Sequence, residues 1–154
     1  MAVTPGIIVL IAAVVLGGGL SLLKTRYDGR FRGMRRREAV TDVPDGFDGR
    51  LTAAALDAEL GERATLLQFS SAFCAPCRAT RRILAEVESM VDGVRHIELD
   101  AEAHLDLVRR LDIMRTPTVL VLDSTGAIVT RASGQPRKAD VIAALGAAVD
   151  RQTS

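Results

Sequence analysis

Cys74 and Cys77 are the only cysteines of the chain, and two residues separate them in the stretch FCAPC. An apolar run, ATLLQFSS, precedes the pair and an amphipathic helical pattern follows it. A helix that begins at Cys74 would direct free backbone N–H groups and its positive dipole end at this sulfur, which lowers the pKa of the thiol. Cys77 lies one turn further on and could resolve a mixed disulfide formed at Cys74, so the spacing predicts thiol–disulfide exchange. Arg78, Arg81 and Arg82 are interpreted mainly as a solvated helix face.

Three other interpretations of the cysteine pair stay open on the residues alone. The two thiols could be buried and inert, or they could form a structural disulfide, which would add little stability because the closed loop is short. A zinc site would need four ligands, and the chain offers Cys74, Cys77, His96 and His104. The two histidines are further apart than in the usual zinc finger, and no second cysteine pair exists, so we expect neither a metal nor a cofactor.

The hydrophobic pattern predicts alternating helices and strands after residue 49. The expected elements are a helix over 52–60, a strand over 64–71, a helix that starts at the cysteines and is closed by Gly93, a strand over 94–100, a helix over 103–113, strands over 116–123 and 127–133, and a helix over 136–151. Strands that alternate with helices form parallel crossovers, and the last two strands form a hairpin. The order therefore predicts an α/β fold with a mixed central sheet flanked by helices.

The N-terminal residues 1–25 are predicted to form a single transmembrane helix that anchors the chain. The stretch Gly6–Leu23 contains no charged residue. As a helix, these 18 residues would extend roughly 27 Å, about one hydrocarbon core. A cleaved signal peptide lacks support, because no basic segment precedes the run and no small-x-small cleavage site follows it. A buried core helix is the other alternative.

A basic segment follows the apolar run. Between Lys24 and Arg37 there are seven Lys or Arg and one Asp, whereas residues 38–154 carry a net negative charge. We interpret residues 26–48 as a juxtamembrane linker and residues 49–154 as the globular domain. The apolar neighbour favours a lipid bilayer over nucleic acid as the anionic partner. Because cations resist transfer across a membrane, the N-terminus is expected outside and the domain in the cytoplasm; the extracytoplasmic side is the alternative.

The stretch FCAPC after LLQFSSA, with RTPTVLVLD further on, resembles the thioredoxin family. The resemblance runs from about Leu51 to Arg151 and implies a thioredoxin-like fold. It implies that Cys74 attacks a substrate disulfide and that Cys77 resolves the mixed disulfide. It also implies that Pro117 is a cis-proline facing the cysteines and that Thr116 offers backbone groups to a bound peptide. The residues it implies for substrate binding are Phe73, Ala75, Pro76, Thr116, Pro117 and Gly134.

The sequence departs from the family pattern at several positions. Phe73 stands where thioredoxins usually have Trp, and Ala75 stands where they usually have Gly. Gln68 aligns with the family's buried Asp, and an amide cannot take a proton from Cys77 as that carboxylate would. His96 aligns with the family's Lys and is interpreted as an ordinary strand residue.

These observations predict a membrane-anchored thiol–disulfide oxidoreductase that reduces protein disulfides through the CAPC dithiol. Its expected partners are disulfide-bearing protein substrates, an electron donor such as a thioredoxin reductase or a membrane thiol carrier, and the lipid bilayer. The alternative is a membrane-tethered interaction module that docks a partner with little or no turnover. A domain on the extracytoplasmic side would instead serve cytochrome maturation or disulfide repair.

Overall fold

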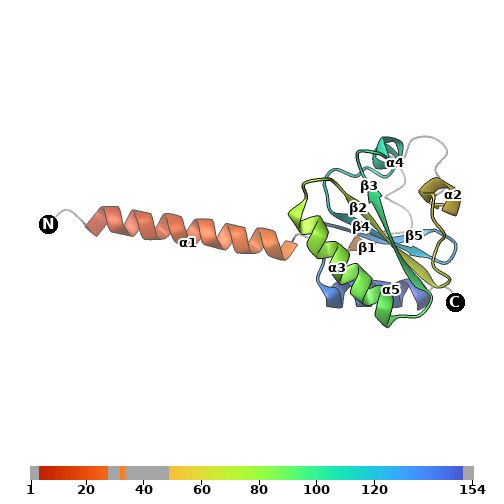
Figure 1. Cartoon of the computed structure of the whole chain (residues 1–154). Coiled ribbons are helices and arrows are strands. Elements are labelled where there is room, and N and C mark those ends of the chain that lie inside the picture. Colours follow the sequence, from red (N-terminus) through yellow and green to blue (C-terminus); the bar gives the residue numbers. More distant parts are fainter. Residues whose placement is uncertain (1–3, 28–31, 34–48, 151–154) are drawn as a thin grey trace.

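The computed structural model describes residues 4–27, 32–33 and 49–150, so most of the predicted linker lies outside the described residues. Figure 1 shows a long N-terminal helix followed by a domain of strands and shorter helices. The elements in chain order are α1 (Thr4–Tyr27), β1 (Arg32–Gly33), α2 (Ala53–Leu56), β2 (Ala64–Ser70), α3 (Ala75–Met90), β3 (Val94–Asp100), α4 (Leu105–Arg110), β4 (Thr118–Asp123), β5 (Ile128–Ser133) and α5 (Lys138–Asp150). From residue 49 onward, this is the order of helices and strands that the sequence predicts.

The described strands form one mixed sheet in the order β1-β5-β4-β2-β3. β2 pairs with β3 in parallel, and α3 provides the crossover between them. β4 runs antiparallel to both β2 and β5, so β4 and β5 form the expected hairpin. β2 is hydrogen-bonded on both sides, and all seven of its residues are buried.

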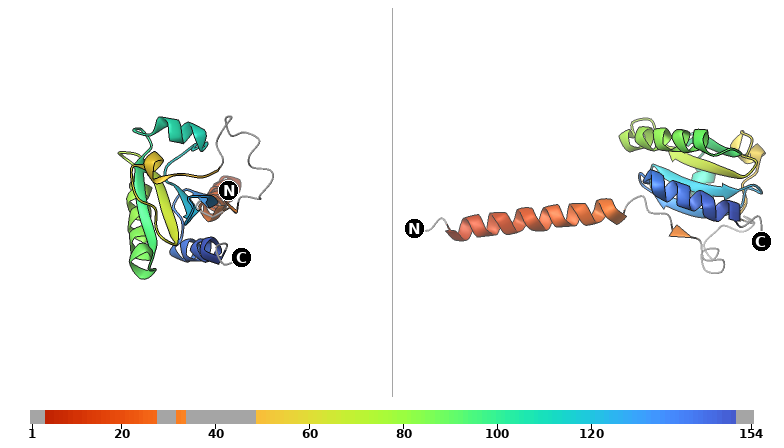
Figure 2. Two further views of the ribbon diagram at one scale, coloured as in Figure 1. Left: turned by 90° about the vertical axis from the view of Figure 1, so that its right-hand side faces the viewer. Right: turned by 90° about the horizontal axis from the view of Figure 1, so that it is seen from below.

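Two hydrophobic clusters lie on opposite faces of this sheet. One cluster joins the sheet to α3 and α5, and the other joins it to α2 and α4 (Figures 1 and 2). Successive residues of β2 alternate between them, with Leu66 in the first cluster and Leu67 in the second, as the pleat of a strand requires. Even-numbered residues of β2 therefore face α3, the helix that begins at the cysteines.

Two helices are shorter than the sequence predicts. α2 begins as expected, with the Thr52 hydroxyl accepting a hydrogen bond from the backbone N–H of Ala55, but it ends at Leu56 instead of residue 60. The next residue, Asp57, has φ of 48°, and the residue two positions after the end of α4, Asp112, has φ of 49°. A left-handed residue directs the chain out of the helix, and Asp adopts this conformation more readily than most residues do.

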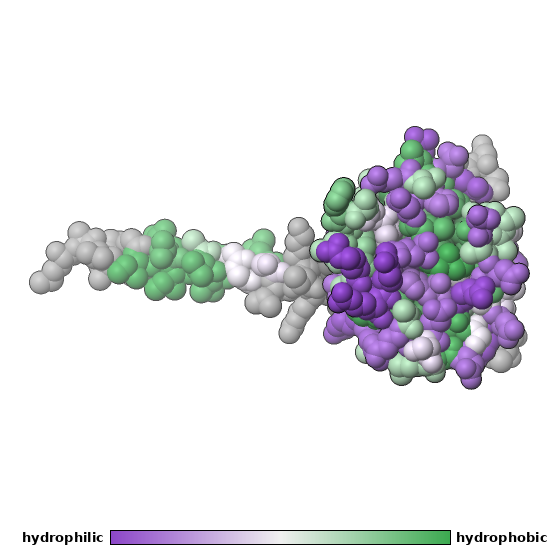
Figure 3. Space-filling model, in the orientation of Figure 1, coloured by the Kyte–Doolittle hydropathy of each residue, from purple (hydrophilic) through white to green (hydrophobic). Residues whose placement is uncertain are grey.

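The apolar side chains described along α1 are exposed, as the green surface in Figure 3 shows. Within the parts of the chain that the structure describes, no helix qualifies by length and apolar character as a candidate membrane span. The membrane anchor stays a prediction.

Candidate active site

The two cysteines lie at the point where the β2–α3 loop becomes helix. Cys74 is the N-cap residue of α3, with an extended backbone (φ −89°, ψ 96°), and its sulfur accepts a hydrogen bond from the backbone N–H of Cys77 at 3.1 Å. Pro76 occupies the first turn, where its missing N–H costs no helical hydrogen bond. Cys74 and Cys77 are joined by a disulfide, with their Cα atoms 5.2 Å apart. The local sequence thus produces the helix-start geometry that favours a thiolate at Cys74 once the disulfide is reduced.

The two sulfur-bearing residues differ in their access to solvent. Cys77 is buried, with 2% of its surface exposed, whereas Cys74 is half-buried. Phe73, Ala75 and Pro76 are close to Cys74 in the sequence and are all exposed; Phe73 is exposed to 99%. A disulfide partner can therefore reach Cys74, while Cys77 is shielded by the domain.

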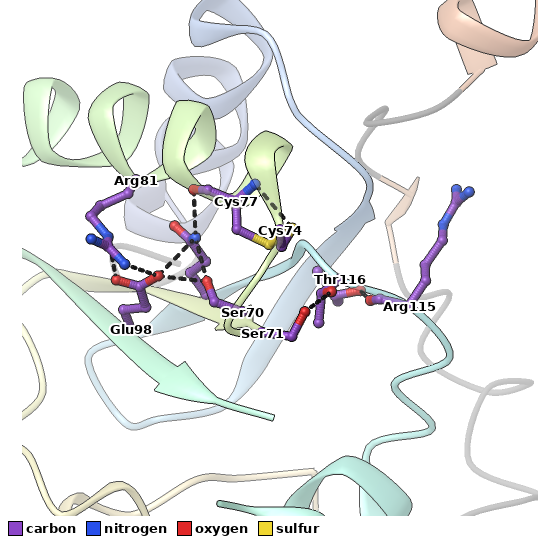
Figure 4. The surroundings of a disulfide bond; sticks show 10 residues. Ser70, Ser71, Cys74, Cys77, Arg81, Glu98, Arg115 and Thr116 are labelled. Carbon is purple, nitrogen blue, oxygen red and sulfur yellow. Dashed lines mark hydrogen bonds and ion pairs between the residues drawn. A yellow bond between two sulfur atoms is a disulfide. The ribbon is translucent and has the colours of Figure 1, made fainter. Parts of the chain in front are cut away.

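The loop before β4 lies beside the disulfide. The Thr116–Pro117 peptide bond is cis, the geometry that the family resemblance implies. The Thr116 hydroxyl is 2.9 Å from the hydroxyl of Ser71, which lies in the β2–α3 loop (Figure 4). Gly134, which has φ of 92°, donates its backbone N–H to the carbonyl of Pro117 at 2.7 Å. The structure thus joins Gly134 to Pro117 and places Thr116 against the loop that leads to the cysteines.

Two arginines connect the segment before Pro117 to β5. Arg115 donates a hydrogen bond to the carbonyl of Ser133 at 3.2 Å. Arg131 donates to the carbonyls of Leu111 and Asp112, close to the end of α4. The segment that carries the cis-proline is therefore held at both of its ends.

A polar network lies on the other side of the disulfide, beneath Cys77 (Figure 4). The amide nitrogen of Gln68, a fully buried residue, donates to the carbonyl of Cys77 at 3.0 Å and to the hydroxyl of Ser70 at 2.7 Å. Ser70 in turn donates to a carboxylate oxygen of Glu98 at 2.6 Å. Arg81 of α3 pairs with both oxygens of that carboxylate, at 2.5 and 2.8 Å.

Sequence reasoning missed Glu98 and Ser70, and it treated Arg81 as part of a solvated helix face. The parallel register of β2 and β3 places Gln68 directly opposite Glu98, and the even-numbered residues of both strands face α3. Pairing the two predicted strands in parallel would have placed Glu98 beside Gln68. Arg81 could then have been recognised as a partner for Glu98, because it follows Cys77 by four residues and so lies one turn further along the same helix.

Two titratable groups of this region have shifted pKa values. Burial alone would raise the pKa of Glu98, but hydrogen bonds from Arg81 and Ser70 and the positive charge of Arg81 hold it below its ordinary value. Burial lowers the pKa of His96 in spite of the nearby carboxylates of Glu88 and Glu98. At neutral pH, Glu98 is therefore ionised and His96 is mainly uncharged.

The two histidines considered for a zinc site make their hydrogen bonds to residues other than the cysteines. The backbone N–H of His96 donates to Glu88, and a ring nitrogen of His104 lies 2.9 Å from the carbonyl of Asp100. Among the described residues, no group of three or more His, Cys, Asp or Glu side chains is arranged to hold a metal ion. In this structure the sulfurs of Cys74 and Cys77 are bonded to each other.

Comparisons with known proteins agree with this geometry. The family model described as Thioredoxin matches residues 49–147. A thioredoxin of Bacillus subtilis (strain 168) is 25% identical over 91 residues, which cover 58% of this chain and 88% of that protein. A solved structure described as that of a malarial protein superposes with a TM-score of 0.51 at 16% identity, over 56% of this chain and 98% of the other. The chain belongs to the thioredoxin family, and its cysteine pair makes it a thiol–disulfide oxidoreductase.

Proposed function

We propose that this protein is a membrane-anchored reductase of protein disulfides. The observation that carries the proposal is the asymmetry of the Cys74–Cys77 disulfide. Cys74 is half-exposed, caps a helix and accepts the N–H of Cys77, whereas Cys77 is buried behind it. An attacking thiol needs access and a stabilised anion, and a resolving thiol needs proximity to the first sulfur.

The exchange proceeds in two steps from the dithiol form. The Cys74 thiolate attacks one sulfur of a substrate disulfide, forms a mixed disulfide and displaces the other substrate sulfur as a thiolate. Cys77, after losing its proton, attacks the Cys74 sulfur and displaces the second substrate sulfur. The substrate gains two electrons and two protons in total, and the protein ends in the disulfide form.

The substrate is a protein segment that lies across Cys74 and the cis-proline loop. Phe73 offers an exposed aromatic surface on one side of Cys74, and Ala75 and Pro76 extend that apolar surface. Thr116 is half-buried beside the disulfide, where its backbone groups can pair with an extended chain. Pro117 and Gly134 hold that backbone in place through their 2.7 Å hydrogen bond.

Turnover requires an external donor of two electrons, because the chain carries one cysteine pair. A thioredoxin reductase or a membrane thiol carrier would regenerate the dithiol. The reducing direction is supported by the Pro before the second cysteine, which is typical of the reducing members of the family.

The anchor is residues 1–25, and the basic residues that follow it support placing the globular domain on the cytoplasmic side. An impermeant thiol reagent added to intact cells tests this placement. Protection of reduced Cys74 until the cells are broken supports a cytoplasmic domain, and labelling in intact cells places the domain outside.

Reduction of insulin by dithiothreitol, followed by turbidity, tests the enzymatic step. The wild-type domain should accelerate the reaction, and Cys74→Ser should abolish the acceleration. Cys77→Ser should accumulate mixed disulfides with substrates, because the resolving step is blocked. If Cys74→Ser reduces insulin as fast as the wild type, the proposal fails.

An interaction module without turnover is the second candidate. The observation that favours it is the neutral amide of Gln68 beneath Cys77, where the family has a carboxylate. Wild-type protein that binds partners but does not accelerate insulin reduction would support this function.

A further inference from the structure

Among the described residues, the carboxylate of Glu98 on β3 is hydrogen-bonded into the network beneath Cys77, where the β2 position carries the neutral amide of Gln68. Its link to the cysteines consists of two side chains, Ser70 and Gln68. The inference below rests on the proposed function, because it concerns the redox equilibrium of the same disulfide.

The direction of each hydrogen bond in the network follows from the acceptors present. The side-chain nitrogen of Gln68 faces the carbonyl of Cys77 and, at 3.4 Å, a carboxylate oxygen of Glu98, and both of these can only accept. This fixes the orientation of the amide. Ser70 accepts from Gln68, and its own proton then goes to Glu98 at 2.6 Å. The donors therefore start at the amide nitrogen of Gln68, which donates both to the Cys77 carbonyl and to Ser70, and Glu98 is the final acceptor on the Ser70 side.

Arg81 supplies the compensating charge. Its guanidinium binds both carboxylate oxygens of Glu98, and its side chain is 57% exposed against 22% for Glu98. Arg81 follows Cys77 by one helical turn, so the positive and the negative charge both lie on the α3 side of the sheet. Among the described residues, His96 also acts electrostatically on Glu98, and it is largely uncharged at neutral pH because burial lowers its pKa. Glu88 accepts a hydrogen bond from the backbone N–H of His96.

We propose that the charge balance of the Glu98–Arg81 ion pair controls the redox equilibrium of the Cys74–Cys77 pair, with Glu98 as a positioning residue that is linked to Cys77 through Ser70 and Gln68. The two charges cancel in the native protein. Removing either one leaves the other uncompensated next to the first turns of α3, where the thiolate forms. A net positive charge stabilises the thiolate and therefore the dithiol form, and a net negative charge stabilises the disulfide.

The test is a set of three variants in the full chain: Glu98→Gln, Arg81→Met and the double substitution. Each is equilibrated in glutathione redox buffers, and the ratio of dithiol to disulfide is measured by mass after alkylation. Glu98→Gln should shift the equilibrium constant toward the dithiol and Arg81→Met toward the disulfide, each by roughly threefold to tenfold. The double variant should return close to the wild type.

The matched control is Glu86→Gln, which removes one partner of an ion pair between α3 and Lys138, on a residue outside the Cys77 network. It should leave the equilibrium constant unchanged. A second readout is the pH at which half of Cys74 is alkylated in the reduced protein, which should fall in Glu98→Gln and rise in Arg81→Met. A purely structural role would not move the two variants in opposite directions.

Shifts of the same sign in the two single variants, or no shift in either, overturn the proposal. If Glu98→Gln does not fold, Arg81→Met decides alone, because its exposed guanidinium can be removed without opening the core. Failure of the reductase proposal is distinguishable, because this equilibrium uses the protein's own disulfide and needs no protein substrate.

Discussion

Restoring the family's carboxylate at position 68 should destabilise this protein, because Glu98 already occupies the same polar network. The perturbation is Gln68→Asp. Gln68 is fully buried, and its amide nitrogen lies 3.4 Å from a carboxylate oxygen of Glu98. An aspartate is one methylene shorter, so two negative charges would lie about 5 Å apart, and at an effective dielectric constant near 20 their repulsion costs about 3 kcal/mol.

The control for this prediction is Gln68→Asn, which has the size of the aspartate without its charge. Both variants lose the same packing, so the difference in their free energies of unfolding isolates the charge. Urea unfolding at pH 7 should find the aspartate variant less stable than the asparagine variant by about 1–2 kcal/mol, because the positive charge of Arg81, which binds Glu98, offsets part of the repulsion.

The difference in stability between the two variants should depend on pH. Repulsion and burial raise the pKa of the introduced carboxyl in the folded state, so its penalty is present at neutral pH. The penalty shrinks as pH falls through that raised value, and it vanishes below the ordinary pKa of Asp, near 4. Equal stability of the two variants at pH 7 would refute the idea that Glu98 supplies the charge of this site.

Three further predictions concern individual residues. Phe73→Ala should change the free energy of unfolding by less than about 0.5 kcal/mol, because the ring is exposed to 99%, yet slow insulin reduction more than reduction of a small aromatic disulfide. Gly134→Ala should cost about 1–2 kcal/mol in urea unfolding, since φ of 92° disfavours a side chain, and should raise the KM for protein substrates by moving the Pro117 loop. Glu98 has a lowered pKa in the fold, so it contributes stability above its unfolded pKa that is lost as pH falls through the folded value. The stability gap between wild type and Glu98→Gln should therefore close between neutral and acidic pH.

The features that depend on short stretches of chain could be predicted from the sequence. The strand over 94–100 has the observed bounds, because Ile97 and Leu99 alternate with polar residues and Gly93 precedes the strand. The start of α3 at the cysteines likewise follows from neighbours in the chain. Helix ends were less predictable: the first domain helix was expected to end at residue 60, whereas Asp57 ends α2 by adopting the left-handed conformation.

The features that depend on contacts between distant elements could not be predicted in the same way. Glu98 follows Gln68 by 30 positions, and it becomes part of the site only through the parallel register of β2 and β3. Arg81 looked like one of several solvated arginines because its partner lies on another element. The cis bond at Pro117 came from the family resemblance, since nothing in the local sequence distinguishes it from a proline at the start of a strand.

The reactive cysteines follow shortly after β2, which is buried along its whole length and hydrogen-bonded to a neighbouring strand on each side. A protein that repeatedly makes and breaks one disulfide works best when the surrounding backbone keeps the same conformation in each cycle. Any displacement of the cysteines would have to move β2, whose buried side chains are closely packed and leave the strand little room to shift. Conformational changes during turnover should therefore be confined to the β2–α3 loop, and each new substrate should meet the same domain structure.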